Sequence, residues 1–189
     1  MKKSLPILLA VALVSFRMTS PESTRVCLNA EELKLYNLIM AYRKEKTLEA
    51  IPLSSKLTLV AQTHARDLSE NFDLSNKKCN LHSWSKKGKW ESCCYTDDHK
   101  KASCMWKKPR EIAGYESDGF EISYFSSAGA NADDGIAGWK ISPGHNQVMI
   151  NEGTWKQVKW NAIGIGIYKE YGVVWFGTLK DDAPLVNCN

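Results

Sequence analysis

The sequence predicts an α+β fold, because helical patterns come first along the chain and strand patterns come last. Residues 29–46 and 54–68 carry apolar residues at helical spacing, whereas residues 163–179 alternate and are rich in β-branched and aromatic residues. Short connections between the strands favour antiparallel layers over a parallel, doubly wound sheet. A length of 189 residues is enough for one domain with a buried core.

Residues 1–20 are expected to be a secretory signal peptide, with a core helix as the alternative. A short basic start, Met1-Lys2-Lys3, precedes a 12-residue apolar run at residues 5–16, which is too short to span a bilayer. No other segment is apolar enough to cross a membrane, so we expect a secreted protein, either extracellular or periplasmic. Without residues 1–20 the formal charge falls from +4 to about +1 (22 basic, 21 acidic), which gives no argument for nucleic acid as a partner.

The first helix begins at a capping box, with Asn29 as N-cap and Glu32 three residues later. Its apolar stripe extends to about residue 46. A second helix begins at Ser54 or Ser55, after Pro52. His64 falls on its apolar face, where a core histidine with one hydrogen-bond partner is favoured over a functional group.

Residues 77–110 show no sustained period and predict a long loop region braced by disulfides. The interleaved tryptophans of this segment could stack against sugars or bases, but the small core of a disulfide-braced loop is the favoured interpretation. With an export signal, an even number of cysteines indicates disulfide bonds; the six are Cys27, Cys79, Cys93, Cys94, Cys104 and Cys188.

The pairing of these cysteines is partly constrained by their positions. Cys93 and Cys94 are adjacent and could pair with each other only under strain, so we expect them to take two different partners. Cys79 and Cys104 are the near candidates. Cys27 and Cys188 would then tie the two ends of the domain together.

The last third of the chain predicts a helix, a turn and a hairpin. A helix with acids at its start fits residues 135–141. Pro143-Gly144 favours a turn, which would give the following His145 a fixed direction. Residues 163–167 and 173–179 then form a β-hairpin around a turn at residues 169–172.

His82 and His145 are the most informative candidates for chemistry, because both lie at loop or turn positions. Glu116 and Glu121 lie between them in a segment without cations. Two imidazoles and a carboxylate are the ligands of an open zinc site, and the same groups can act as general acid and base without metal. Ser83 lies beside His82, but no G-x-S-x-G elbow accompanies it, so nucleophilic catalysis is disfavoured.

One segment resembles the W-x-x-S-P-G-H-x-x-x-(M/I)-(L/I) signature of secreted CAP-domain proteins (cysteine-rich secretory, antigen 5 and pathogenesis-related type 1), namely "GWKISPGHNQVMI" at residues 138–150. Further pieces resemble family segments in the family's order: "LYNLIMAYR", "LSSKLTLVAQTHARDL", "LHSWS", "GFEIS" and "WNAIGIGIY…GVVWFGTL". The resemblance covers roughly residues 29–179.

This resemblance implies an α-β-α sandwich with a central, mainly antiparallel sheet, formed by residues 21–189 as a single CAP domain with a Cys/Trp-rich loop insertion at residues 79–110. It also implies a cleft where His82 and His145 hold a divalent metal such as Zn²⁺, with Glu121 as the cleft carboxylate and candidate catalytic group. Glu116 is the alternative carboxylate, and Ser83 would lie nearby. The family's second glutamate has no match here.

The resemblance favours a secreted, non-enzymatic protein that binds an extracellular lipid, sterol, glycan or protein, because no single activity unites the family. One alternative is a metal-dependent extracellular hydrolase that uses His82, His145 and Glu121. In the other alternative, these side chains only stabilise the fold.

Overall fold

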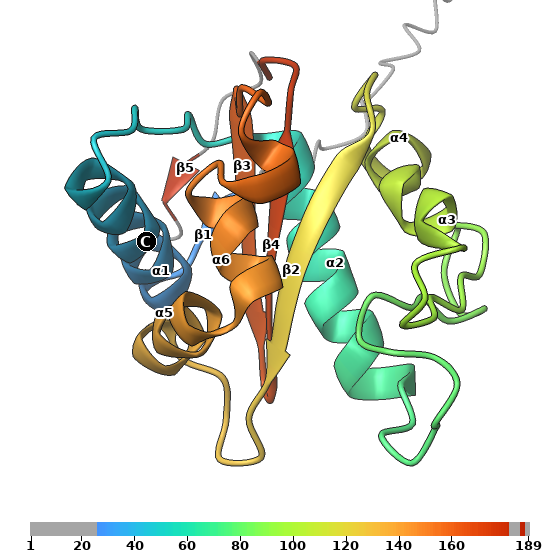
Figure 1. Ribbon diagram of the computed structural model, residues 1–189. Helices are drawn as coiled ribbons and strands as arrows, with labels where there is room; N and C mark the ends of the chain where they lie inside the picture. Colours follow the sequence, from blue (N-terminus) through green and yellow to red (C-terminus); the bar gives the residue numbers. More distant parts are fainter. Residues whose placement is uncertain (1–25, 182–185, 188–189) are drawn as a thin grey trace, which may run out of the picture.

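A computed structural model describes residues 26–181 and 186–187 (Figure 1). The predicted signal peptide and Cys188 lie outside the described residues. The elements follow in the order β1 (Cys27–Leu28), α1 (Ala30–Glu45), α2 (Ser55–Asn71), α3 (Ala102–Trp106), α4 (Lys108–Ala113), β2 (Gly119–Phe125), α5 (Ala132–Ile141), α6 (Pro143–Met149), the 3₁₀ helix η1 (Gly153–Trp155), β3 (Ala162–Tyr168), β4 (Tyr171–Gly177) and β5 (Val186–Asn187).

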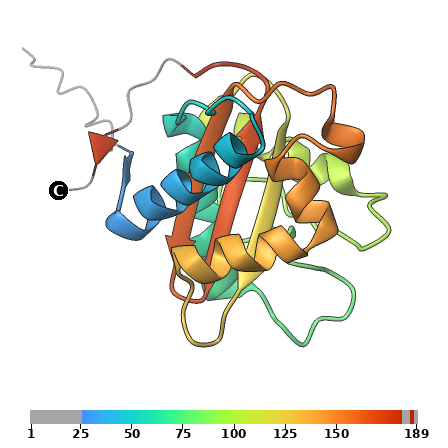
Figure 2. The ribbon, with the colours of Figure 1, turned by 60° about the vertical axis from the view of Figure 1, so that its left-hand side comes forward.

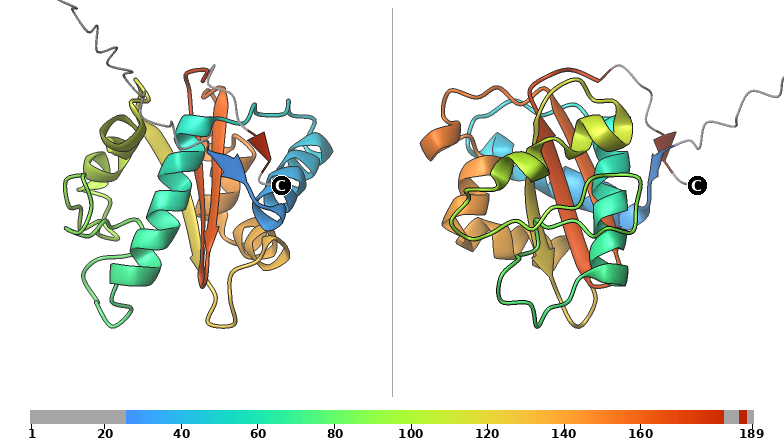
Figure 3. Two further views of the ribbon diagram at one scale, coloured as in Figure 1. Left: turned by 180° about the vertical axis from the view of Figure 1, so that it is seen from behind. Right: turned by 90° about the vertical axis from the view of Figure 1, so that its right-hand side faces the viewer.

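These elements form the α+β fold that the sequence predicts, arranged as the α-β-α sandwich that the family resemblance implies. The central sheet is antiparallel with the order β2-β4-β3, and β1 pairs with β5 in a separate parallel pair. Helices α1, α5 and α6 cover one face (Figure 2). Helix α2 lies across the other face, beside α3, α4 and the insertion (Figure 3).

Alternation along the strands divides the core into two clusters, one on each face. Val174 and Phe176 of β4 pack with α1 and α5, whereas Val173 and Trp175 pack with α2 and the insertion. All four side chains are fully buried. Successive residues of a strand point to opposite faces, so both faces of this central strand are apolar.

The predicted helix starts are confirmed. Asn29 and Glu32 form the reciprocal capping box of α1, and the Ser54 side chain accepts a hydrogen bond from the Leu57 N–H at 2.9 Å. Helix α5 begins earlier than predicted, because Asn131 caps it by accepting a hydrogen bond from the Asp134 N–H at 2.9 Å. The hairpin is also confirmed, with a turn at Lys169-Glu170.

Two glycines of β3 allow α2 to pack directly against the sheet. A Cβ atom at Gly164 would lie 2.0 Å from the backbone of Leu57, and one at Gly166 would lie 2.3 Å from that of Ala61. Backbone atoms cannot move aside without shifting α2. The "GIGIY" segment is therefore a strand that accepts a closely packed helix.

The predicted turn at Pro143-Gly144 is wrong, because these residues are the first turn of α6. Proline fits the first position of a helix, since its missing N–H has no partner there and its φ is already helical. His145 thus lies in the first helical turn. The loop predicted over residues 77–110 is also interrupted, by α3 and the start of α4.

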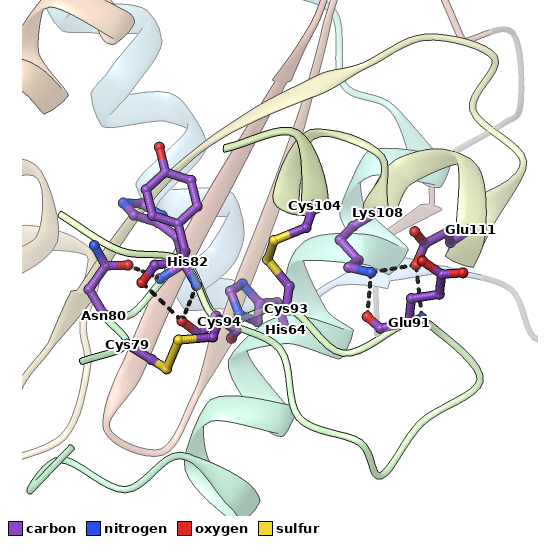
Figure 4. The surroundings of a disulfide bond; sticks show 12 residues. His64, Cys79, Asn80, His82, Glu91, Cys93, Cys94, Cys104, Lys108 and Glu111 are labelled. Atoms are coloured by element: carbon purple, nitrogen blue, oxygen red, sulfur yellow. Dashed lines mark hydrogen bonds and ion pairs between the residues drawn. A yellow bond between two sulfur atoms is a disulfide. The ribbon is translucent and has the colours of Figure 1, made fainter. Parts of the chain in front are cut away.

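Disulfides brace the insertion, as the sequence predicts. Cys79 pairs with Cys94 and Cys93 pairs with Cys104, so the adjacent cysteines take different partners (Figure 4). The second bond joins α3 to the loop that carries Cys93. Cys27 is also disulfide-bonded.

Candidate functional site

A cleft of about 430 Å³ lies at the free edge of the sheet, along strand β2. Helix α6 lies on one side of this strand and α3 on the other (Figure 1). The cleft is lined by His82, Tyr95, His99, Ala102, Met105, Trp106, Phe120, Glu121, Ile122, Gly144, His145, Gln147, Val148, Thr154 and Trp155. The edge strand, α6 and the insertion therefore build it together.

Glu121 is the central polar group of the cleft. Its carboxylate accepts a hydrogen bond from His64 Nδ1 on one oxygen and from His82 Nδ1, at 2.8 Å, on the other. Complete burial of the side chain raises the pKa of Glu121, but attraction and hydrogen bonds from His64 and His82 outweigh it and hold the pKa below its usual range. Glu121 is therefore ionised at neutral pH, with both oxygens engaged.

His64 lies behind Glu121 and is fully buried. Its Nε2 donates to the Ser83 carbonyl oxygen at 2.9 Å, while its Nδ1 donates to Glu121. A carbonyl and a carboxylate are both acceptors, so each ring nitrogen of His64 faces an acceptor oxygen. The ring also stacks on Trp84, with centroids 4.0 Å apart. The expected core histidine thus has two partners rather than one, and one of them is the cleft carboxylate.

His82 and His145 face each other across the cleft, with ring centroids 6.4 Å apart. The structure thus brings the two predicted histidines together. His82 comes from the loop that begins the insertion, where its backbone N–H donates to the Asn80 side chain (Figure 4). Its side chain is 19% exposed and therefore reaches the solvent of the cleft.

His145 is held without a proton at neutral pH. Burial and, to a smaller extent, the neighbouring His82 lower the pKa of His145 to about 4, against the opposing effect of Glu121. Its Nδ1 is buried and has no hydrogen-bond partner within the described ranges. A neutral imidazole with an unused nitrogen can accept a proton, a hydrogen bond or a metal ion.

The site does not provide the three protein ligands of an open zinc site. Within residues 26–181, no group of three His, Cys, Asp or Glu side chains has the geometry to hold a metal ion. His82 and His145 have the right chemistry, but both oxygens of Glu121 are bound by imidazoles. The residues therefore fit a two-imidazole contact to a metal and not a complete coordination set.

The remaining predicted candidates lie outside the cleft lining. Glu116 is exposed in the turn before β2 and does not line the cleft, so it is not the cleft carboxylate. Ser83 is buried; its Oγ accepts from the Tyr95 N–H at 2.9 Å and contacts the Tyr95 carbonyl oxygen at 3.5 Å. Ser83 therefore braces the insertion and is not presented as a nucleophile.

The aromatic residues that line the cleft were not among the candidates predicted from the sequence. Tyr95 and His99 come from the insertion, and the Tyr95 hydroxyl lies 3.0 Å from His99 Nδ1. Phe120 contacts Trp106 and Trp155, with ring centroids 5.6 and 4.9 Å apart. The high aromatic content of residues 84–106 was the feature of the sequence that could have indicated these residues. It does not separate the two roles, because Trp84 is buried in the core, whereas Trp106 lines the cleft.

Comparison with known proteins identifies the family. Residues 36–174 match the model of the CAP, or cysteine-rich secretory protein, family. No curated protein matches the chain. Among the described residues, no helix has the length and apolar character needed to cross a membrane.

Solved structures of SCP-domain and cysteine-rich secretory proteins share the fold. An extracellular SCP-domain protein of Bacillus anthracis is 16% identical with a TM-score of 0.54 over 77% of this chain. A cysteine-rich secretory protein of Staphylococcus aureus is 15% identical with a TM-score of 0.51 over 79%. The chain spans 39% and 38% of the length of these two proteins.

An outer surface protein of Borrelia burgdorferi is 20% identical with a TM-score of 0.52, and the match covers 80% of this chain and 95% of that protein. At these identities the structures establish the fold alone. The family model, in contrast, matches most of the chain, including the strand that carries Glu121 and the helix that carries His145. The chain therefore belongs to the CAP, or cysteine-rich secretory protein, family.

Proposed function

We propose that the protein is an extracellular, non-enzymatic binding protein whose cleft holds a small amphipathic molecule, with lipids and sterols as the favoured class. The observation that carries this proposal is the division of the cleft into an apolar wall and a polar end. Met105, Trp106, Phe120 and Trp155 form the wall, and the histidines form the end. A mostly apolar pocket with a few convergent polar groups is the usual form of a small-molecule site.

The aromatic wall is expected to supply most of the affinity. Trp106 and Trp155 are half-buried, so each ring keeps an open surface next to Phe120 that a ligand can cover. Aromatic side chains bury large areas at little cost in conformational entropy, which makes them strong anchors. The histidines would orient the polar group of the ligand.

Fluorescence titration with dehydroergosterol and cis-parinaric acid tests the proposal. We expect saturable binding that weakens at least about tenfold in Trp106→Ala and in Trp155→Ala, because each change removes an anchor of roughly 1.4 kcal/mol or more. Leu74→Ala is the matched control, since Leu74 is 51% exposed and does not line the cleft. Absence of saturable binding, or equal weakening by all three variants, contradicts the proposal.

The alternative hydrolase would use His82 and His145 with a metal ion and Glu121 as the base. It is disfavoured because Glu121 is buried and both of its oxygens already accept hydrogen bonds. The discriminating measurement is zinc content after dialysis, beside His82→Ala and His145→Ala. About one zinc per chain, lost in both variants together with a chelator-sensitive hydrolytic activity, would favour the hydrolase. Lipid binding that persists in both variants would favour the binding protein.

A further inference from the structure

A second pocket, of about 310 Å³, lies at the carboxyl end of α1 and apart from the cleft. Three segments form it: the end of α1 and the loop after it, the residue two positions after α6, and the segment after η1. It is lined by Arg43, Thr47, Leu48, Glu49, Ala50, Asn151, Lys156, Val158, Lys159 and Trp160.

Arg43 forms the floor of this pocket and is only 4% exposed. Its Nε donates to the Glu49 carbonyl oxygen at 3.1 Å, and its Nη1 donates to the Met149 carbonyl oxygen at 2.6 Å and to Asn151 Oδ1 at 2.7 Å. The second terminal nitrogen, Nη2, makes no hydrogen bond to any described residue. Neutral acceptors thus hold Nε and Nη1, whereas the two N–H groups of Nη2 can still donate to a ligand.

The charge of Arg43 has no counter-ion within the described part of the chain. No carboxylate there forms an ion pair with it. Glu49 is the one acidic residue in the lining, and its side chain is 88% exposed and lies 3.9 Å from Lys159 Nζ. Burial lowers the pKa of Arg43 to about 10, so the guanidinium stays protonated at neutral pH. A buried cation without a counter-ion is costly, and an incoming anion would offset that cost.

The rim adds positive charge. Lys156 and Lys159 are exposed and line the same pocket, where they can approach a bound anion without losing their hydration. The side chain of Asn151 is itself held in place, because its Nδ2 donates to the Val158 carbonyl oxygen at 2.7 Å. Asn151 therefore connects Arg43 to the backbone at Val158, between the two lysines, before any ligand binds.

We propose that this pocket binds a small oxyanion of the phosphate or sulfate class. Arg43 Nη2 would donate from the floor, and Lys156 and Lys159 would neutralise the remaining charge from the rim. A guanidinium can donate from Nη2 to the anion while its Nε and Nη1 stay bonded to the protein, and a lysine at this position could not do both. The anion can be the free ion or the terminal group of a phosphate monoester.

Amide NMR titration of the full mature chain at low ionic strength tests this proposal, with sodium phosphate, sodium sulfate and glycerol 3-phosphate as probes and sodium chloride as the ionic-strength control. We expect saturable shifts at Asn151, Lys156 and Trp160 that chloride does not reproduce. Equal affinity for phosphate and glycerol 3-phosphate would identify the phosphate group as the feature recognised, whereas binding of the inorganic ions alone would identify a site for the free ion.

Variants that remove lysine charges distinguish anion binding at this pocket from a general effect of protein charge. Lys156→Gln with Lys159→Gln is expected to weaken phosphate binding about tenfold with the fold intact, because both side chains are exposed. Lys77→Gln with Lys78→Gln removes the same charge from an exposed loop outside the pocket and should leave affinity unchanged. Arg43→Lys should abolish the shifts at Asn151. Absence of anion-specific shifts, or equal weakening by the two lysine pairs, overturns the proposal.

Discussion

Glu121 shows how one side chain organises the candidate site. It is fixed on β2 and receives hydrogen bonds from His64 of α2 and His82 of the insertion, so it joins three segments that are distant in the sequence. Such a network stabilises the fold only while all its members are satisfied. The structural role proposed for the histidines and glutamate is therefore compatible with a role in ligand binding.

Glu121→Gln should be strongly destabilising. The change removes the negative charge of a fully buried carboxylate that pairs with His64 and His82, and breaking such a buried pair costs about 3 kcal/mol or more. Urea unfolding at pH 7 measures the loss. Glu116→Gln is the matched control, since Glu116 is exposed and should change stability by less than about 0.5 kcal/mol. Equal effects of the two substitutions would contradict the network.

Because the pKa of His145 is lowered in the folded protein, we expect the free energy of unfolding to depend on pH. Its folded pKa of about 4 lies below the ordinary value of 6.5, so the unfolded chain binds the proton more readily. The stabilisation is complete above pH 6.5 and is lost as the pH falls from 6.5 towards 4. Between pH 7 and pH 5 we expect a loss of roughly 1–2 kcal/mol after allowance for the partial exposure of the ring.

The measurement is urea unfolding of the wild type and of His145→Gln at both pH values. The variant cannot titrate and should lose less stability over this range. Glu121 stays ionised at pH 5, because its pKa is below its usual range, so it does not contribute to the difference. An identical loss in the two proteins would show that another group is responsible.

At the scale of elements, helix α1 fixes the position of α6. The Tyr42 hydroxyl donates to Asn146 Oδ1 at 3.0 Å, and Arg43 holds the Met149 carbonyl oxygen at the other end of α6. These contacts place His145 at the cleft. On the other face of the sheet, close packing of α2 against β3 fixes His64 beneath Glu121.

Gly164→Ala should cost about 3 kcal/mol, because its Cβ atom would overlap the backbone of Leu57 and push α2 from the sheet. Gly138→Ala is the contrasting substitution. A Cβ atom at Gly138 meets nothing within 4 Å, and alanine favours the helical state of α5, so stability should rise by up to about 1 kcal/mol. Thermal unfolding of both variants checks the pair. Similar changes in stability for the two variants would argue against close packing of α2 on β3.

At the scale of the whole molecule, the sheet has one edge at β2 where both helical layers and the insertion converge. The insertion is part of the core as well as of the cleft, since Trp84 and Met105 are buried in the cluster beneath α2. The cleft therefore depends on the docking of a segment that the disulfides hold.

Removal of the Cys93–Cys104 bond should release α3 from the cleft. Cys93→Ala with Cys104→Ala should cost roughly 3 kcal/mol and speed hydrogen exchange in residues 102–106. Cys79→Ala with Cys94→Ala opens a loop of similar length that does not include α3, so exchange there should stay slow. Unchanged exchange in the first variant would show that packing alone holds α3.

Local features of the fold could be predicted from the sequence because each depends on neighbouring residues. The caps at Asn29 and Ser54 and the β3–β4 hairpin are of this kind. The start of α6 was missed because Pro143-Gly144 is compatible with a turn and with a helical first turn, and the burial of Val148 and Met149 favours the helix.

His82, Glu121 and His145 were candidates from the sequence by their residue types and by resemblance to the CAP family, and the structure brings them together. Only the tertiary structure decided that Glu121 rather than Glu116 lines the cleft, that His64 is its buried partner, and that the buried Arg43 forms no ion pair with any residue the structure describes. The physical reason is the same in each case. Hydrogen bonds, burial and uncompensated charge depend on atoms that the fold brings together from distant positions, whereas caps and alternation are determined within a few residues.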